Sequence, residues 1–336
     1  MKLSLFAYSR AGCQTARRVR AALPACEAAL YTMARFQEDG FLPLEKWVYG
    51  ECFEACDVMI FVGACGIAVR EIAPYVCDKK TDPAVLNLDE RAQFVIPLLS
   101  GHIGGANRLA LQLAQALGAQ AVITTATDVN GKFAVDAWAA QNGCAISSMA
   151  LAKRFAAEIL EHDVPFCSAF PVSGALPGGI AEGNEGALGL SIGYDRREPF
   201  VQTLRLSPKV LRVGVGCRRG ISKQAVEDAI HTVFEENGLE SAAIAGVYSI
   251  DLKKDEAGLL EACCENGWPV QFYTAQELAA VPGEFTASEF VSSVTGVENV
   301  CERAAMRGAE KLLVQKTALG GVTVAVALEH WEVRFG

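Results

Sequence analysis

Residues 94–107 read FVIPLLSGHIGGAN, and this stretch shows the pattern that organises the whole chain. Its first six residues are an apolar run that predicts a buried strand, and residues 108–117 predict the helix that follows. The turn between them contains glycines, which allow a tight backbone and a close approach by a ligand. A strand that ends in glycines and opens a helix is the repeating unit of layered α/β folds.

The same alternation continues on both sides of this stretch. Strands are predicted at residues 2–8, 57–62, 84–88 and 121–125, with helices at 11–22, 44–56, 67–75 and 133–142. The pattern restarts near residue 210, with strands at 210–215, 243–249, 270–273, 311–317 and 322–328 and helices at 222–237, 256–266, 274–281 and 297–308. Continuous apolar strands interleaved with helices are typical of mostly parallel sheets covered by helices.

A less regular segment lies between these two halves. It contains a predicted helix at 149–161, strands at 164–170 and 188–194, and a Gly/Pro-rich loop at 171–186. The sequence therefore predicts an α/β fold of two layered α/β domains with largely parallel sheets, joined by a small α/β middle segment. The expected boundaries are 1–143, 144–208 and 209–336.

Composition restricts the partners and the compartment. The formal net charge of −9 argues against nucleic acid or an anionic membrane surface as a partner. The longest apolar run, at 58–69, is shorter than the roughly 18 residues that a membrane span needs. Twelve cysteines in a chain without a visible leader indicate a reducing, cytoplasmic setting. Their spacing lacks a second ligand pair, so no metal site is expected.

The turn at 100–107 is the first candidate site. We expect its strand to end at the carboxyl edge of the sheet, where α/β folds bind ligands, and the next helix to offer unpaired N–H groups to an anion. His102 is the only side chain in the turn that titrates near neutral pH. A helix N-terminus favours neutral imidazole, the form that a general base needs. The alternative is that His102 only caps the helix or bonds to the backbone.

A second candidate is the turn at 215–222, which contains Arg218 and Arg219. Cations at the start of a helix oppose the helix dipole, and a bound carboxylate or phosphate would remove that conflict. The alternative is that both side chains extend into solvent.

Charged residues also follow other predicted strands, at Asp128, Glu90 and Lys253. Each of them alone is more commonly a solvated loop residue than part of a site. The chain lacks the GxxxxGK[ST] and GxGxxG patterns, which argues against a P-loop ATPase and a dinucleotide-binding enzyme.

These segments together resemble the CbiG family, the cobalt-precorrin-5A hydrolases of anaerobic cobalamin synthesis. The resemblance spans nearly the whole chain and is carried mainly by SGHIGGAN at 100–107 followed by GCRRG at 216–220. Ala92 and Ile221 stand where the family pattern has Gly and Thr. Further matching segments lie at 62–70, 82–85, 89–90, 123–128, 249–253 and 296–305.

The resemblance implies a hydrolase that opens the δ-lactone of cobalt-precorrin-5A and releases a two-carbon unit as acetaldehyde, giving cobalt-precorrin-5B. The cobalt enters as part of the substrate, so neither a cofactor nor a protein-bound metal is implied. The implied partner is an anionic cobalt-corrinoid small molecule, whose acetate and propionate groups suit arginines and lysines. The oligomeric state is not implied, and a homodimer stays open.

For this reaction we hypothesise that His102, or otherwise Asp128 or Glu90, activates water as the catalytic base. Amides at Gly104 and Gly105 would stabilise the developing oxyanion. The residues expected to bind substrate are Ser100, Gly101, Gly104, Gly105, Asn107, Thr125, Arg218, Arg219 and Lys253.

Two other functions are compatible with parts of the sequence. A non-catalytic corrinoid-binding or carrier protein of the same pathway would have no need of a titratable group inside a glycine turn. A flavodoxin-like flavin binder suits the layered fold but would require a clearer phosphate loop.

Overall fold

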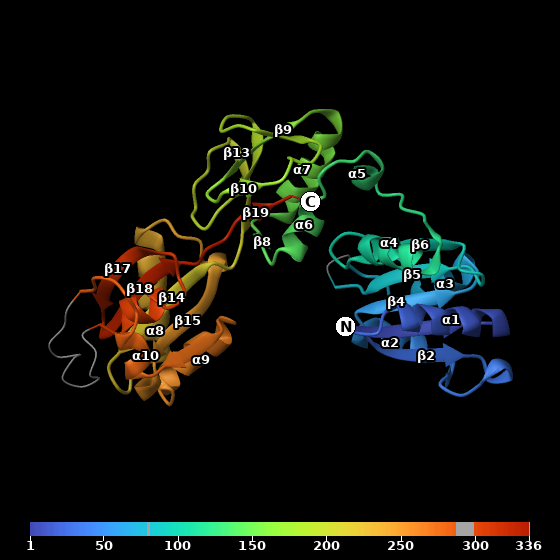
Figure 1. Cartoon of the computed structure of the whole chain (residues 1–336), viewed down its shortest axis with the longest axis horizontal. Helices are drawn as coiled ribbons and strands as arrows, with labels where there is room; N and C mark the ends of the chain where they lie inside the picture. The colour runs from blue at the N-terminus through green and yellow to red at the C-terminus, as the bar shows by residue number, and fades with distance from the viewer. Residues whose placement is uncertain (79–80, 287–298, 336) are drawn as a thin grey trace. The chain divides into compact units, whose positions relative to one another are not determined.

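The computed structural model describes residues 1–78, 81–286 and 299–335. Its internal contacts divide the chain into two compact units, Met1–Trp138 and Ala139–Gly336 (Figure 1). The expected α/β class with largely parallel sheets is confirmed in both units. The division into three segments stays a prediction.

The first unit is built on a seven-stranded sheet in the order β3-β2-β1-β4-β5-β6-β7. Its strands are β1 (Lys2–Ala7), β2 (Glu27–Thr32), β3 (Leu42–Pro43), β4 (Val58–Val62), β5 (Ala84–Leu88), β6 (Phe94–Leu99) and β7 (Gln120–Ala121). The strands β1 to β5 run parallel to one another. However, β6 runs antiparallel to β5, and β7 follows the direction of β6. The largely parallel sheet therefore ends in two reversed strands.

Helices cover both faces of this sheet (Figure 1). Ile60 on β4 packs with residues of α1 and α4, while its neighbour Phe61 packs with residues of α2 and α3. Burial on both faces explains why β4 is apolar at every position. The helices of this unit are α1 (Arg10–Ala22), α2 (Val48–Ala55), α3 (Cys65–Ile72), α4 (Ala106–Leu117) and α5 (Ala126–Val129), with a 3₁₀ turn, η1 (Ala34–Phe36). Helix α6 (Val135–Gln141) begins in this unit and ends in the second one.

The second unit begins with a sheet in the order β11-β9-β12-β13-β8. Its helix α7 (Met149–Glu161) coincides with the predicted one, and its N-terminus is capped by the Ser148 hydroxyl, which accepts from the Leu151 amide at 3.2 Å. A C-terminal strand returns to this region, where β19 (Val333–Arg334) pairs with β10 (Val172–Ser173). The sheet contains β8 (Ala145–Ile146), β9 (Val164–Ser168), β11 (Ile180–Glu182), β12 (Leu188–Ile192) and β13 (Gln202–Ser207).

The other sheet of this unit has the order β16-β15-β14-β18-β17. Its central strands β14 and β15 are parallel, and β18 runs antiparallel to β14. The strands are β14 (Leu211–Cys217), β15 (Ile244–Ile250), β16 (Val270–Tyr273), β17 (Lys311–Leu319) and β18 (Val322–Leu328). The helices are α8 (Lys223–Glu236), α9 (Ala257–Glu265), α10 (Ala275–Ala279) and α12 (Cys301–Met306), with 3₁₀ turns η2 (Ser241–Ala243) and η3 (Asp251–Lys253).

Several predicted elements differ in extent. The strand expected at 121–125 pairs only over β7, and the helix expected at 44–56 begins at Val48. Of the helix expected at 297–308, α12 is the observed part, whereas residues 297–298 lie outside the described residues. No helix among the described residues combines the length and apolar character required to cross a bilayer.

Close packing of α12 on β14 depends on Gly214. A Cβ atom at this position would lie 1.8 Å from the carbonyl oxygen of Cys301 and 2.8 Å from the amide nitrogen of Ala305. Both contacts involve helix backbone, which cannot rotate away. The missing side chain therefore lets α12 lie directly against the sheet.

Gly214→Ala is expected to destabilise the second unit by roughly 1–3 kcal/mol or more, because overpacking moves backbone. Urea unfolding followed by circular dichroism would measure the loss. Gly193→Ala is the matched control, since the nearest atom to its added Cβ would be Ala169 Cβ, at the ordinary contact distance of 3.5 Å. Equal stabilities of the two variants would contradict the packing argument.

Candidate active site and a second pocket

The glycine turn lies at an unexpected edge of the first sheet. Because β6 is antiparallel to β5, Leu99 pairs with Val85, close to the start of β5. The Ser100 hydroxyl donates to the carbonyl oxygen of Asp82, which precedes β5, at 3.0 Å. The expectation of a carboxyl-edge site was therefore wrong. The turn lies where the parallel strands begin.

The compact form of the turn explains its glycines. Ser100 adopts a positive φ of 55°, and a Cβ atom at Gly104 would lie 2.4 Å from the Cβ atom of Ser100. At Gly101 an added Cβ would lie 2.7 Å from the side-chain oxygen of Asn107. Any larger residue at these two positions would displace the turn or Asn107.

The backbone amides at the start of α4 are used within the turn itself. The amide of Gly105 donates to the His102 carbonyl at 3.0 Å, and the Asn107 amide donates to the Gly101 carbonyl at 3.0 Å. The Ala106 amide donates to the Ser100 carbonyl at 3.2 Å. The predicted oxyanion role of Gly105 was therefore wrong, because its N–H already has an acceptor.

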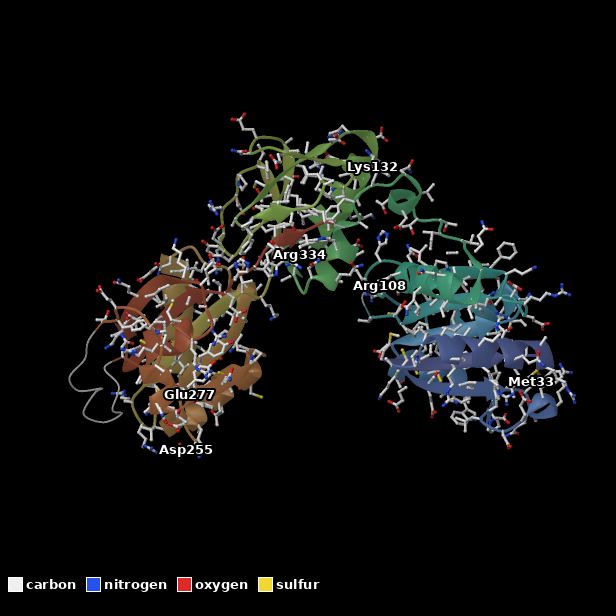
Figure 2. All side chains as sticks on the ribbon, in the orientation of Figure 1. Met33, Arg108, Lys132, Asp255, Glu277 and Arg334 are labelled. Atoms are coloured by element: carbon white, nitrogen blue, oxygen red, sulfur yellow. The ribbon has the colours of Figure 1, made fainter. Side chains whose placement is uncertain are left out.

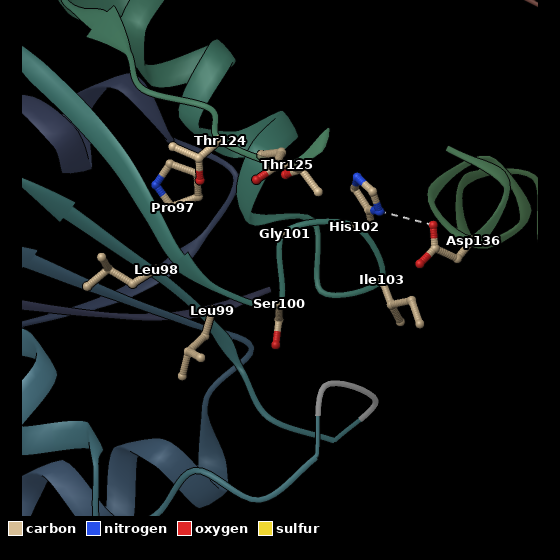
Figure 3. A pocket seen from close by; sticks show the side chains of 11 residues that line it. Pro97, Leu98, Leu99, Ser100, Gly101, His102, Ile103, Thr124, Thr125 and Asp136 are labelled. Carbon is tan, nitrogen blue, oxygen red and sulfur yellow. Dashed lines mark hydrogen bonds and ion pairs between the residues drawn. The ribbon is translucent and has the colours of Figure 1, made fainter. Parts of the chain in front are cut away.

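His102 lies between two carboxylates that come from different helices. Its Nε2 atom is 2.9 Å from Oδ2 of Asp128 on α5, and its Nδ1 atom is 3.1 Å from Oδ1 of Asp136 on α6. The hydroxyl of Thr127 lies 3.4 Å from Nε2. Figure 3 shows the ring extending from the turn toward Asp136. The imidazole therefore connects the glycine turn to two further segments of the chain.

This environment favours the charged ring. The hydrogen bond with Asp136 raises the pKa of His102 to about 9, against the effect of partial burial, and Asp128 adds to the increase. The expectation of a neutral imidazole was wrong, because two adjacent carboxylates outweigh the helix N-terminus. At neutral pH His102 is an imidazolium, which cannot accept a proton.

Asn107 acts inside this network. Its side chain is 7% exposed, and its Nδ2 group donates to Thr125 Oγ1 at 2.8 Å and to Asp128 Oδ2 at 2.9 Å. Asn107 and His102 therefore hold the same oxygen of Asp128. Both Asn107 and Thr125 line the adjacent cavity, and their polar groups also orient Asp128. Their role in substrate binding stays a prediction.

The cavity beside this network has a volume of about 370 Å³ (Figure 3). One part of its wall is polar and comes from the glycine turn, from Asp136 and from the end of the segment after β7. The other part is apolar, so a hydrophobic ligand could contact it next to the charged ring. The lining residues are Pro97, Leu98, Leu99, Ser100, Gly101, His102, Ile103, Asn107, Thr124, Thr125 and Asp136.

Glu90 belongs to the opposite edge of the sheet. It follows β5, and its carboxylate accepts from the Ser9 hydroxyl at 2.5 Å, at the start of α1. Its carbonyl oxygen accepts from the Thr15 hydroxyl at 2.6 Å. The structure does not bring Glu90 to His102, because the length of β5 separates the two edges.

The second predicted turn borders a larger pocket, of about 730 Å³, in the second unit. It lies at the carboxyl ends of β14 and β15 and beside the hairpin between β17 and β18. Arg218 and Lys253, two of the residues expected to bind substrate, line it together with Lys316 on β17. The described lining residues include these cations and no carboxylate side chain. An acidic protein therefore presents a basic, largely apolar pocket.

The sequence predicted that the two arginines of this turn lie at the start of a helix, where their charge opposes the helix dipole. This prediction was wrong. Helix α8 begins at Lys223 and is capped by Ser222, so the arginines precede its first turn. The Gly220 amide donates to the buried Glu256 carboxylate at 2.6 Å. Arg219 is 73% exposed and lies 3.8 Å from Asp255, which is labelled in Figure 2. Arg219 thus fits the solvent-exposed alternative, although it also borders the pocket.

Comparison with known proteins identifies the family of this chain. Family models for the N-terminal part and the C-terminus of cobalamin synthesis G match residues 48–128 and 211–327. A cobalt-precorrin-5A hydrolase of Salmonella typhimurium is 32% identical over 351 residues, which cover 98% of each chain. One from Priestia megaterium is 34% identical over 300 residues, covering 82% of this chain and 79% of that protein. This chain belongs to the CbiG family.

The CbiG matches confirm the resemblance inferred from the two glycine turns. The N-terminal CbiG model includes His102 and ends at Asp128, whereas Asp136 lies beyond it. The protein CobE of a Sinorhizobium species is 31% identical over 121 residues, which cover 35% of this chain and 79% of CobE.

Two residues that line the pockets escaped the sequence prediction. Asp136 lies in the first turn of α6, and Lys316 lies in a strand. The charged start of the helix at 133–142 was the only available signal for Asp136. Among the described residues, no group of three or more His, Cys, Asp or Glu side chains is arranged to hold a metal ion.

His102→Gln is expected to lower the unfolding free energy of the first unit at pH 6.5 and to have little effect at pH 10. The folded state raises the pKa of His102 from 6.5 to about 9, so the associated stability is present below 6.5 and is lost as pH rises through 9. Urea unfolding at several pH values measures it, with the exposed His162→Gln as control. A destabilisation that grows with pH would contradict the assignment.

Proposed function

We propose that this protein is a cobalt-precorrin-5A hydrolase of anaerobic cobalamin biosynthesis. The observation that carries the proposal is the full-length similarity to a protein of that name, together with a titratable network at the matched glycine turn. Relatives named for this activity also come from Priestia megaterium and Methanocaldococcus jannaschii. A carrier without catalysis is not favoured, because the similarity includes the first unit.

The proposed reaction has two parts. Water adds to the carbonyl carbon of the δ-lactone, and the ester C–O bond breaks to leave a carboxylate and a hydroxyl group. The hydroxyl then loses its proton as the neighbouring C–C bond breaks. Its oxygen becomes the carbonyl oxygen of acetaldehyde, and the electron pair of the C–C bond stays on the macrocycle. We propose that cobalt takes part only as a component of the substrate and that the protein supplies no cofactor.

We place the chemistry at the cavity beside His102. It is the cavity in which proton-transferring groups lie next to apolar walls, as lactone hydrolysis of a macrocycle requires. His102 and Asp128 remain the candidate catalytic residues. We propose no role in the reaction for Glu90, because it lies at the other edge of the sheet. We also propose none for the Gly105 amide, because it is already hydrogen-bonded.

We place recognition of the substrate's carboxylates at the pocket of the second unit. Arg218, Lys253 and Lys316 supply positive charge there, and Lys253 is held by Glu256 at 3.6 Å. Apolar lining residues such as Leu252 and Leu319 suit the faces of a macrocycle. This combination fits an amphiphilic polyanion better than a small inorganic ion.

Oxygen-free incubation of the purified protein with cobalt-precorrin-5A is expected to yield one acetaldehyde per substrate and a product that has gained water and lost acetaldehyde. Mass spectrometry and trapping of the aldehyde measure both. His102→Ala is expected to lose at least roughly 100-fold in kcat, as for other acid–base groups, while still binding substrate. His162→Ala is the control. Substrate bound by the wild type without turnover would support the carrier function instead.

Arg218→Ala is expected to weaken substrate binding roughly tenfold or more, because one charge-assisted hydrogen bond contributes about 1.5–3 kcal/mol. The value of kcat should stay close to that of the wild type. Anaerobic absorbance titration measures Kd, and Arg197→Ala, which removes an exposed arginine outside the pocket, is the control. Equal affinities of the two variants would remove Arg218 from recognition.

A further inference from the structure

Asp136 is a carboxylate that faces the proposed reaction cavity and contacts its histidine directly. Its Oδ1 atom lies 3.1 Å from Nδ1 of His102, and both side chains are 17% exposed. Both residues also line the cavity, as Figure 3 shows. The contact comes from the first turn of α6, whereas the other carboxylate on the ring, Asp128, comes from α5.

The two contacts define the protonation state of the ring by geometry. A neutral imidazole has one N–H group and one lone pair, so its lone pair would face a carboxylate oxygen in this arrangement. Only the imidazolium donates to Asp128 and Asp136 at the same time. The raised pKa of His102 agrees with this geometry. The groups that face the ring are these two carboxylates and the hydroxyl of Thr127.

The two carboxylate oxygens of Asp128 differ in their contacts. Its Oδ2 atom accepts from both His102 and Asn107. In the part of the chain that the structure describes, no donor contacts its Oδ1 atom, and the side chain is 35% exposed. A carboxylate fixed through one oxygen and open at the other is suited to take a proton from water.

We propose that Asp136 is a positioning residue of the hydrolase: it holds His102 as an imidazolium, so that His102 donates a proton during lactone opening while Asp128 accepts one. The inference rests on the proposed function and assigns opposite roles within its site. It replaces the histidine base expected from the sequence with a histidine acid.

The proton transfers of the lactone-opening step balance. The water oxygen bonds to the lactone carbonyl carbon, and one water proton passes to Asp128. The ring C–O bond breaks with its electron pair on the oxygen, which takes the proton from Nε2 of His102. Asp128 then returns its proton to His102 across their 2.9 Å hydrogen bond. Both side chains regain their starting states, and no oxidant or other reagent is consumed.

The first test uses the protein without substrate. Nitrogen-15 NMR of the histidine rings, assigned with His102→Gln, is expected to show His102 with both nitrogens protonated at pH 7.5. Asp136→Asn should move its titration to lower pH by at least about one unit, because one carboxylate is removed. Glu310→Gln, which removes a carboxylate 2.9 Å from the exposed His330, should leave the His102 signal unchanged. A neutral His102 in the wild type would overturn the inference.

The second test uses turnover of cobalt-precorrin-5A as a function of pH. Wild-type kcat is expected to fall above about pH 9, as the acid loses its proton. In Asp136→Asn this decline should move to lower pH, and kcat at pH 8 should fall by up to roughly 100-fold with KM little changed. If Asp136 had a purely structural role, the decline of kcat in Asp136→Asn would stay at the same pH as in the wild type.

The outcomes separate the inference from the proposed function. Acetaldehyde release that rises as His102 loses its proton, or an Asp136→Asn variant that is faster at pH 8, would overturn the inference and leave the hydrolase intact. Absence of acetaldehyde from the wild type would end the proposed function, and the inference with it. Thermal unfolding of each variant identifies any loss of activity caused by misfolding.

Discussion

The direction of β6 decides which side chains can meet in the first unit. A parallel β6 would have carried the glycine turn to the edge where Ser9 and Glu90 lie. The antiparallel pairing of Val85 with Leu99 carries it to the other edge, beside Asp82. The segments that follow α4 then supply Asp128 and Asp136 to His102. The proposed catalytic network therefore exists because one strand pair is reversed.

The charge state of His102 follows from a comparison of magnitudes. A helix N-terminus near a cation costs about 0.3–1 kcal/mol. A unit charge pair near 4 Å, at an effective dielectric constant of 20, contributes about 4 kcal/mol before desolvation. His102 has two such partners, at 2.9 and 3.1 Å. The carboxylates therefore determine the protonation state, and the chemistry expected of the ring changes from base to acid.

The charge that lines the pocket of the second unit is opposite in sign to the net charge of the chain. The chain has a formal charge of −9, yet the described lining of its larger pocket has cations without carboxylates. Glu256 lies behind the lining, where it holds the Gly220 amide and Lys253. Glu256 thus positions Lys253, and Gly214 lets α12 approach the strand that leads into the pocket.

The sequence by itself determined the strand–turn–helix units, their approximate positions and the two glycine turns. Helix α7, for example, begins and ends as predicted. These features follow from apolar periodicity and from glycine, which act over a few neighbouring residues. Strand β2, which reads EAALYT, shows no clear apolar periodicity, and it was not predicted.

Only the tertiary structure decided the direction of β6, the exclusion of Glu90 and the partnership of His102 with Asp136. An apolar strand has the same side-chain alternation whether it pairs parallel or antiparallel, so its direction is set by hydrogen bonds to a distant strand. Asp136 is 34 positions from His102 in the sequence. Its effect depends on distance in space, because the interaction of two charges is a property of their separation and surroundings.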